Sequence, residues 1–312
     1  MKVVVTGGAG FIGANLCRAL AAAPGVEEVV ALDDLSTGSA ANLDGVDVAL
    51  VRGDLVDPHV LDAVLPGTTC VVHLGARPSV PRSLQDPLAT HTVNATGTLQ
   101  VLEGMRRHAV PHVVVASSSS VYGINPYLPK HEALTPMPVS PYAVSKLATE
   151  AYAIAHAACF DLRALAFRFF NVFGPLQAAG HAYAAVVPAF VSAALAGEPV
   201  TVHGDGGQTR DFTYVGTVCE VIARAVTGGV SSPHPVNLAF GGRFSLLEVL
   251  ERVEVIVGHP IERVHVAPRA GDVRDSQADQ TRLRSLFPEV VPVGLDDGLG
   301  RTLKWFRTGA VG

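Results

Sequence analysis

The stretch from Lys2 to Gly13 constrains the fold of this chain more than any other. The β-branched run Lys2 to Thr6 is followed by Gly7-Gly8-Ala9-Gly10-Phe11-Ile12-Gly13 and then by a segment of helical composition, Ala14 to Ala23. Glycine permits a tight turn, lets the backbone approach a pyrophosphate and allows a helix to pack closely on a strand. The helix N-terminus then faces the anion. Because these glycines lie between a strand and a helix, they predict a dinucleotide-binding turn.

Further apolar runs alternate with helical segments along the first half of the chain. We expect parallel strands over Glu28–Leu32, Val48–Arg52, Cys70–Leu74 and Val113–Ala116. This alternation predicts an α/β fold, a Rossmann-like doubly wound parallel sheet with a smaller C-terminal substrate-binding lobe. Ligands bind at the carboxyl ends of such strands, which here carry Gly7, Asp33, Asp54, Gly75 and Ser118.

Polar residues at two element boundaries bear on the cofactor. Asp33 and Asp34 lie about 20 residues after the last glycine, where a carboxylate binds the adenosine ribose hydroxyls. A carboxylate there would repel the extra phosphate of NADP, so the sequence favours NAD. A second helix, from about Asn94 to His108, should pack on the sheet, with Asn94 as its cap or as a ligand.

A set of groups suited to proton transfer lies between Ser117 and Lys146. Ser118-Ser119-Ser120 follow a buried strand, and Tyr142 and Lys146 stack one turn apart on a helical segment that continues to Ala158. A lysine ammonium favours the phenolate form of a neighbouring tyrosine, so we expect Lys146 to lower the pKa of Tyr142. Because Y-x-x-x-K is a common pattern, two rim residues of an amphipathic helix are the alternative interpretation.

Composition excludes several classes of protein. A formal net charge of −5 gives no reason to expect nucleic acid or an anionic membrane as a partner. The longest apolar stretch, Ala182 to Ala196, contains Pro188 and is shorter than a membrane span. The four cysteines have no paired spacing, which argues against disulfides and a metal site. Met1-Lys2 runs straight into a strand, so we expect no signal peptide and a soluble, cytoplasmic protein.

Beyond about Leu165 the pattern is less regular. Gly204-Asp205-Gly206-Gly207 is typical of a hairpin turn, and it leads to Thr209-Arg210-Asp211-Phe212. A second loop, Pro268 to Asp272, contains Arg269. Two arginines in loops that face a dinucleotide crevice indicate a phosphorylated substrate, because guanidinium pairs with phosphate in a forked geometry. Each arginine taken singly could equally be a surface ion-pair partner.

Together these motifs resemble a known family over essentially the whole chain. The sequence is similar to extended short-chain dehydrogenases/reductases of the NAD-dependent sugar-nucleotide epimerase/dehydratase type. The resemblance rests on Thr6 to Gly13, Leu32 to Gly38, Gly53-Asp54-Leu55, Ser118 to Gly123, Ser140 to Lys146, Arg168 to Pro175 and Arg210-Asp211-Phe212. It implies an NAD-binding domain over residues 1–168 and a substrate lobe over 169–312, with about 211–240 returning to the first domain.

Within this family, the residues after Ser118 separate the activities. The 4,6-dehydratases carry Asp-Glu there and sugar-nucleotide decarboxylases usually carry a glutamate second, whereas this chain has Ser119-Ser120. The resemblance therefore implies a UDP-hexose 4-epimerase that works through a transient 4-keto sugar, with Ser118, Tyr142 and Lys146 as catalytic residues. A UDP-glucuronate 4-epimerase or a dehydratase of the same fold is the alternative, and a non-catalytic NAD-sensing protein is a third.

The resemblance also assigns the two binding sites and a partner. It places NAD against Gly7, Gly10, Phe11, Ile12, Gly13, Asp33, Asp34, Leu35, Thr37, Gly38, Asp54, Leu55, Leu74, Gly75, Ala76, Asn94, Ser117, Tyr142, Lys146 and Phe169. It places the UDP-sugar against Ser79, Ser118, Ser119, Ser120, Asn171, Ala185, Val186, Val187, Thr201, His203, Arg210, Arg269, Asp272 and Ser276. Small Ser276 leaves room for a 2-acetamido group. We expect a homodimer through the helices that start near Asn94 and Tyr142.

Overall fold

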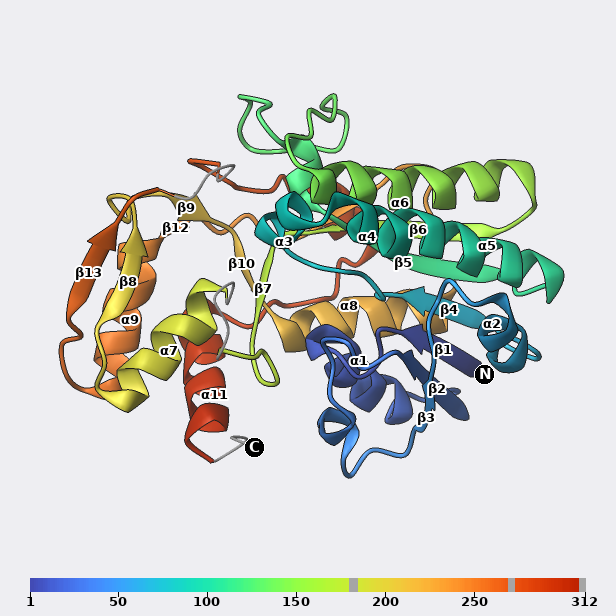
Figure 1. The fold of residues 1–312 in the computed structure, drawn as a ribbon, viewed down its shortest axis with the longest axis horizontal. Coiled ribbons are helices and arrows are strands. Elements are labelled where there is room, and N and C mark those ends of the chain that lie inside the picture. The colour runs from blue at the N-terminus through green and yellow to red at the C-terminus, as the bar shows by residue number, and fades with distance from the viewer. Residues whose placement is uncertain (180–184, 269–272, 309–312) are drawn as a thin grey trace.

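A parallel β-sheet forms the centre of the molecule (Figure 1). The computed structural model describes residues 1–179, 185–268 and 273–308. The seven-stranded sheet has the order β11-β6-β5-β4-β1-β2-β3, and every neighbouring pair is parallel. The strand order reverses between β1 and β4, which is where a doubly wound sheet binds its ligand. The predicted fold class is therefore confirmed.

The strands are short and rich in β-branched residues. Their bounds are β1 Lys2–Thr6, β2 Glu28–Asp33, β3 Ala49–Arg52, β4 Cys70–His73, β5 His112–Ser118, β6 Arg163–Phe169, β7 Asn171–Phe173, β8 Val200–His203, β9 Thr209–Arg210, β10 Phe212–Tyr214, β11 Val236–Leu238, β12 Phe244–Ser245 and β13 Arg263–Val266. The strands expected from the sequence coincide with β1 to β5 to within a few residues at each end.

The helices occupy both faces of the sheet and the C-terminal lobe. Their bounds are α1 Phe11–Ala21, α2 Pro58–Val64, α3 Val80–Gln85, α4 Pro87–His91, α5 Gly97–Arg107, α6 Pro141–Cys159, α7 Val186–Ala196, α8 Val215–Gly228, α9 Leu246–Val257, α10 Thr281–Leu286 and α11 Leu295–Arg307. Short 3₁₀ turns cover Ala40–Leu43 and Ser119–Tyr122, and a π-helical turn covers Thr92–Thr96. None of the helices in the described part of the chain is long and apolar enough to cross a membrane.

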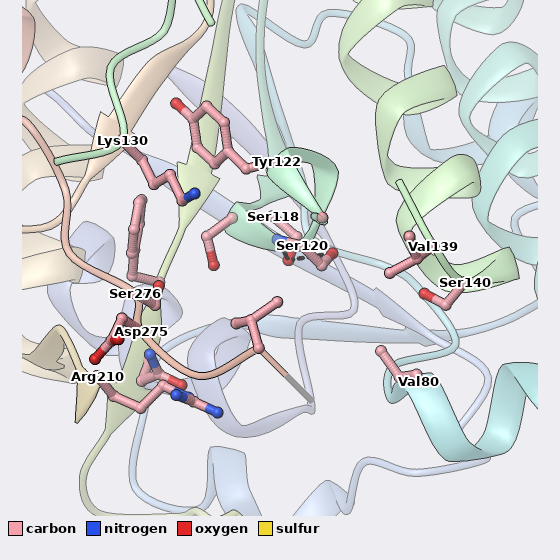
Figure 2. Close-up of a pocket in the computed structure, with 15 residues that line it drawn as sticks. Val80, Ser118, Ser120, Tyr122, Lys130, Val139, Ser140, Arg210, Asp275 and Ser276 are labelled. Atoms are coloured by element: carbon pink, nitrogen blue, oxygen red, sulfur yellow. Dashed lines mark hydrogen bonds between the residues drawn. The ribbon is translucent and has the colours of Figure 1, made fainter. Parts of the chain in front are cut away.

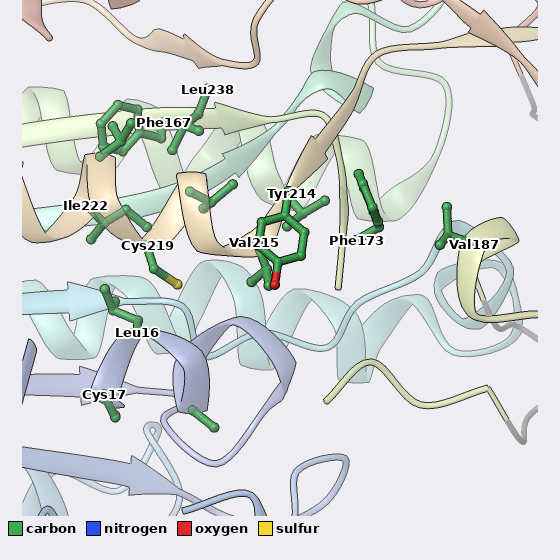
Figure 3. Close-up of a cluster of buried hydrophobic side chains, with 14 of the residues drawn as sticks. Leu16, Cys17, Phe167, Phe173, Val187, Tyr214, Val215, Cys219, Ile222 and Leu238 are labelled. Atoms are coloured by element: carbon green, nitrogen blue, oxygen red, sulfur yellow. The ribbon is translucent and has the colours of Figure 1, made fainter. Parts of the chain in front are cut away.

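Alternate residues of each strand face two separate cores. On β1, Val3 and Val5 pack with α1 and α8, whereas Val4 packs with α2 and α5 on the opposite face. This alternation follows from the period of two along a strand, and both faces are apolar because helices cover both. Figure 3 shows Cys219 of α8 beside Leu16 of α1, and these two helices are neighbours on the same face of the sheet. The same core continues into the C-terminal lobe.

The C-terminal lobe is built from small two-stranded ladders rather than from a hairpin. We expected the glycines at 204–207 to join two paired strands, and this is wrong. Strand β8 pairs in parallel with β13, and β9 pairs antiparallel with β12. Gly204 and Gly206 do have positive φ, so the turn exists, but the strands on either side of it find partners elsewhere in the chain.

The helix expected from Asn94 begins earlier than the sequence indicated. Asp86 caps α4 by accepting a hydrogen bond from the Ala89 amide, and the helical path then continues through the π-helical turn into α5. Asn94 therefore lies inside this path and is not a cap. The segment that carries α8 and β11 returns to the central sheet, where β11 pairs with β6.

Candidate functional site

The turn between β1 and α1 brings backbone atoms unusually close together. Gly7 has a φ of +69°, and a Cβ on it would lie 2.8 Å from the Gly75 nitrogen. A Cβ on Gly13 would lie 2.0 Å from the Gly7 carbonyl oxygen, so no side chain fits. Helix α1 has no acidic residue in its first turn, which leaves the positive end of its dipole uncompensated. This cradle fits the pyrophosphate of a dinucleotide.

The two aspartates after β2 have different environments. Asp33 is buried, and its carboxylate accepts hydrogen bonds from the Ala9 amide at 2.9 Å and the Leu35 amide at 2.8 Å. Asp34 is exposed and accepts hydrogen bonds from the Ser36 amide and hydroxyl. Asp33 therefore ties the glycine turn to the end of β2, and both carboxylates lie beside the cradle, as ribose binding requires.

The end of β4 completes this part of the site. The Gly75 amide donates to the Thr6 hydroxyl at 3.1 Å, and Leu55 packs so closely that a Cβ on Gly75 would lie 2.8 Å from it. Two predicted cofactor contacts have side chains already occupied by protein partners. Asn94 holds the backbone of Arg77 and the Ser145 hydroxyl, and Ser117 donates to Glu150.

Ser118, Tyr142 and Lys146 are brought together at the meeting point of β5 and α6. Helix α6 starts where it does because Ser140 caps it and Pro141 occupies its first turn. Tyr142 is thereby placed on the first turn, close enough to Ser118 for the serine hydroxyl to act on the pKa of the phenol. The Lys146 ammonium, one turn further on, donates to the Ala116 carbonyl at 2.9 Å. The proton-transfer set predicted from the sequence therefore forms one cluster.

The electrostatics of this cluster differ from our expectation. Burial raises the pKa of Tyr142 above 10, and the hydrogen bond with Ser118 offsets this only in part. Burial also lowers the pKa of Lys146 to about 8. The expected lowering of the tyrosine pKa by Lys146 is therefore wrong for this structure, because the lysine ammonium is directed to the Ala116 carbonyl and desolvation of the phenol dominates.

A buried polar network supports the cluster from behind. The Ser117 hydroxyl lies 2.7 Å from a Glu150 carboxylate oxygen and 3.2 Å from the Lys146 carbonyl oxygen. Arg168 on β6 binds Glu150 through two nitrogens, at 2.6 and 3.0 Å, and its guanidinium stacks 4.7 Å from the centre of the Tyr122 ring. These side chains fix α6 against β5 and β6, and so fix the height of Tyr142 and Lys146 above the sheet.

A cavity of about 250 Å³ opens beside Ser118 (Figure 2). Six residues predicted to bind the substrate line it: Ser118, Ser119, Ser120, Asn171, Arg210 and Ser276. The lining also includes residues that the sequence reasoning missed: Val80, Tyr122, Gly123, Lys130, Val139, Ser140, Phe170, Val273 and Asp275. Of these, Tyr122, Gly123, Ser140 and Phe170 lie inside the motifs on which the family resemblance rests.

Other predicted substrate residues lie away from this cavity. Ser79, Ala185, Val186, Val187, Thr201 and His203 are absent from its lining. Val187 is buried in the main core, and Thr201 and His203 belong to the β8–β13 ladder. Arg269 and Asp272 lie outside the described residues. Within the described ranges, no three histidine, cysteine or acidic side chains gather as a metal site would need, and all four cysteines are free thiols.

The fold and the glycine cradle define a dinucleotide-dependent enzyme in which Ser118, Tyr142 and Lys146 lie together, and comparison with known proteins agrees on the class. The model of the NAD dependent epimerase/dehydratase family matches residues 3–239. A UDP-glucose 4-epimerase from Mycolicibacterium smegmatis is 38% identical over 314 residues, which cover 98% of this chain and 99% of that protein.

Solved structures agree over the whole length. The complex of a Thermus thermophilus UDP-glucose 4-epimerase with NAD is 36% identical, with a TM-score of 0.90 and full coverage of both chains. A UDP-N-acetylglucosamine 4-epimerase from Methanobrevibacter ruminantium, in complex with UDP-N-acetylmuramic acid, is 33% identical, with a TM-score of 0.92 and 98% coverage of each chain. This chain therefore belongs to the NAD-dependent epimerase/dehydratase family, and its cofactor is NAD.

Proposed function

We propose that this enzyme interconverts UDP-hexoses at C4, acting on the UDP-glucose/UDP-galactose pair, the UDP-N-acetylglucosamine/UDP-N-acetylgalactosamine pair, or both. The observation that carries this proposal is the position of Ser118, which lines the sugar-sized cavity and lies close enough to Tyr142 to act on the pKa of its phenol. The 4-hydroxyl of a bound hexose would meet both groups there. The relatives described above, which are named as 4-epimerases of UDP-glucose and UDP-N-acetylglucosamine, support the same assignment.

In this proposal each catalytic residue has one task. Tyr142 takes the proton from the sugar 4-hydroxyl, and Ser118 steadies the same oxygen by hydrogen bonding. NAD, when bound, accepts hydride from C4 and returns it to the other face of the 4-keto sugar. Lys146 holds the nicotinamide ribose, for which its burial beneath Tyr142 places it well. Because Tyr142 starts with a raised pKa, part of the catalytic task is to lower it when cofactor and substrate are in place.

The cavity wall supports epimerisation over dehydration. Ser119 and Ser120 line it at the positions where dehydratases would need an acid and a base. The serine hydroxyls cannot serve as the proton acceptor that removal of the C5 proton requires. Ser276, on the same wall, is small and buried, which leaves space for a 2-acetamido group on the sugar.

The cofactor assignments made from the sequence become proposals of the same kind. The glycine cradle holds the pyrophosphate, Asp33 and Asp34 hold the adenosine ribose, and the ends of β3 and β4 flank the adenine and the nicotinamide arm. The division at residues 168 and 169, with a return over about 211–240, is our proposal for the two domains. We also place the enzyme in the cytoplasm, which its free cysteines favour.

UDP-glucuronate is the second candidate substrate. The specific observation in its favour is the polar end of the cavity, where the Ser119 and Ser120 hydroxyls face the sugar. Either hydroxyl could donate to a carboxylate at C6 of the hexose. Asn171 lines the same cavity and would contact either substrate, the neutral UDP-hexose or UDP-glucuronate.

We further propose that two copies of the chain pair through α6 and the helical path from α4 to α5 that contains Asn94. Large apolar side chains are exposed there: Leu88 at 80%, Val144 at 54% and Tyr152 at 38%. These helices form the outer layer on one side of the sheet (Figure 1). Leu88→Glu should shift sedimentation from dimer to monomer, whereas Val255→Glu, at an 82% exposed position on α9, should not. A wild-type monomer at micromolar concentration would overturn this proposal.

The test of the function is product analysis by proton NMR on the purified protein, with no NAD added. UDP-glucose, UDP-N-acetylglucosamine and UDP-glucuronate are supplied separately, and we expect at least one to give its C4 epimer. NAD regenerates in each turnover, so retained cofactor should suffice. Tyr142→Phe should lower kcat by roughly 10²- to 10⁴-fold while NAD content is kept. If all three sugars remain unchanged even after NAD is added, the proposed function is wrong.

A further inference from the structure

Lys130 is a buried cation on the wall of the sugar cavity, and the mechanism above gives it no task. Only 6% of its surface is exposed, and it lines the cavity together with the serines after β5. Its position is fixed from both sides: its amide donates to the Gln277 carbonyl at 2.8 Å, and its carbonyl accepts from the Asp279 amide at 2.8 Å. The backbone of Lys130 is therefore held by a distant segment, and its side chain is buried against the cavity wall.

The ammonium group of Lys130 lacks a carboxylate partner among the residues the structure describes. Its nitrogen donates to the Asn125 carbonyl oxygen. The nearby acids are committed elsewhere: Glu132 accepts from the Asn237 amide at 2.8 Å, and Asp275 pairs with Arg243 at 3.1 Å. Burial lowers the pKa of Lys130, and no acidic group counters that effect. A lysine ammonium has three donors, so it still has donors for a ligand.

Lys130 and Arg210 line one side of the cavity and are separated by Ser276, with Ser118 and Ser120 across from them (Figure 2). Asp275 lies at the Arg210 end, where its charge is already paired. In the proposed function Arg210 meets the diphosphate of the UDP-sugar, and Ser118 meets the 4-hydroxyl. Lys130, which lies away from Arg210 and across from Ser118, would then face a substituent beside C4, such as the one at C6.

We infer that Lys130 binds an anionic substituent on the hexose, so that a sugar with a carboxylate depends on this side chain far more than a neutral sugar does. This inference rests on the proposed function, because it takes the orientation of the sugar from it. The favourable interaction comes from pairing a desolvated ammonium with a carboxylate inside a closed cavity. A neutral hydroxyl at the same place gives only an ordinary hydrogen bond and leaves the charge uncompensated.

The test compares two substrates in the NAD-loaded enzyme, UDP-glucuronate and UDP-glucose, which differ only at C6. Lys130→Met should lower kcat/KM for UDP-glucuronate by roughly 10- to 100-fold and that for UDP-glucose by about threefold. Lys130→Arg keeps the charge and should recover part of the loss. Lys304→Met is the matched control, since Lys304 is exposed on α11 far from the cavity, and it should change neither value.

Binding measurements separate this inference from the proposed function. Calorimetry in the Tyr142→Phe background reports affinity without turnover, and we expect Lys130→Met to weaken binding of UDP-glucuronate far more than that of UDP-glucose. If this holds while no sugar is epimerised, the proposed function fails and the anion subsite stands. Equal losses for both sugars would overturn the inference, because Lys130 would then serve packing alone. Lys130→Gln, which keeps polarity without charge, carries the test if the Met variant unfolds.

Discussion

The cofactor end and the sugar end of this site are built in different ways. At the cofactor end the shape comes from backbone: Gly7, Gly13 and Gly75 approach one another so closely that a single added carbon would overlap its neighbours. At the sugar end the shape comes from side chains on separate segments, among them Ser118 after β5, Lys130 in a loop and Arg210 on β9.

The two ends therefore differ in which substitutions they tolerate. A backbone cradle admits one solution, because glycine alone fits and the ligand it fits is the common pyrophosphate group. A pocket of side chains can be altered one residue at a time without disturbing the sheet that carries the chemistry. Cofactor identity therefore follows from the first strand and turn, whereas sugar preference depends on loops that the tertiary fold brings together.

The largest effect on cofactor binding should come from Gly13→Ala. The new Cβ would lie 2.0 Å from the Gly7 carbonyl oxygen, so the turn must open and the pyrophosphate cradle is lost. We expect NAD affinity to fall by on the order of 100-fold, about 3 kcal/mol. The loss of affinity is measured as a lower NAD content of the purified protein, determined by chromatography after denaturation.

Two other glycines test whether the loss of NAD affinity follows the closeness of the backbone contact. At Gly10 the nearest atom to an added Cβ is the Gly7 oxygen at 3.2 Å, so Gly10→Ala should cost less affinity than Gly13→Ala. At Gly300, in α11, nothing lies within 4 Å, and Gly300→Ala should leave NAD bound and raise stability by about 0.5–1 kcal/mol. Full retention of NAD by the Gly13 variant would show that close backbone packing does not define the cofactor end.

The next effect concerns Glu150, which lies behind both ends of the site. Glu150→Ala removes the partner of Arg168 and leaves a guanidinium buried at 3% side-chain exposure. Removing one partner of a buried pair costs about 3–5 kcal/mol. Because Ser117 also loses its acceptor, α6 should shift, and kcat should fall more than KM rises. Urea unfolding and steady-state kinetics on the NAD-loaded enzyme measure the two quantities.

A surface pair provides the control for Glu150. Glu220 and Arg224 lie 2.9 Å apart on α8, but both are well exposed, so Glu220→Ala should cost less than about 1 kcal/mol. Replacing both buried partners with methionine should restore part of the stability without restoring kcat. Similar stability for the Glu150 and Glu220 variants would mean that the buried network does not hold the two ends together.

The sequence predicted the cofactor end well because its signals are local. The glycine spacing, the strand before it and the aspartates after β2 all lie within one strand–helix–strand unit. Tyr142 and Lys146 were placed correctly relative to each other because one helix carries both. The pKa shift of Tyr142 was predicted in the wrong direction, because it depends on how deeply the folded chain buries the phenol.

The sugar end could be predicted only in part, for the same physical reason. Its lining comes from segments as far apart as Val80, Lys130 and Ser276, and no local period reports such contacts. The expected hairpin was wrong because β8 and β9 each pair with a strand that comes much later in the chain. Arg210 was singled out by its place in a loop facing the predicted crevice and Asn171 by the family resemblance, whereas Lys130 required the structure.

The smallest effect tests how the sugar end is held to the sheet. Asp211 is buried, and its carboxylate accepts hydrogen bonds from the Gly241 amide at 2.9 Å and the Ala278 amide at 3.2 Å. Burial raises the pKa of Asp211 to about 7. In the unfolded chain the pKa is about 3.9, so between these values the folded protein holds a proton that the unfolded chain has released. Stability from this group is therefore present at low pH and is lost as pH rises towards 7.

Asp211→Asn should remove that pH dependence, because the amide oxygen can still accept both backbone hydrogen bonds and carries no charge. Between pH 4 and pH 8 the unfolding free energy of the wild type should fall by about 1–3 kcal/mol relative to that of the variant. Asp47→Asn, at an exposed position, is the control and should run parallel to the wild type. Parallel curves for Asp211→Asn as well would show that Asp211 titrates like a surface carboxylate, and that the loops of the sugar end are fixed by other contacts.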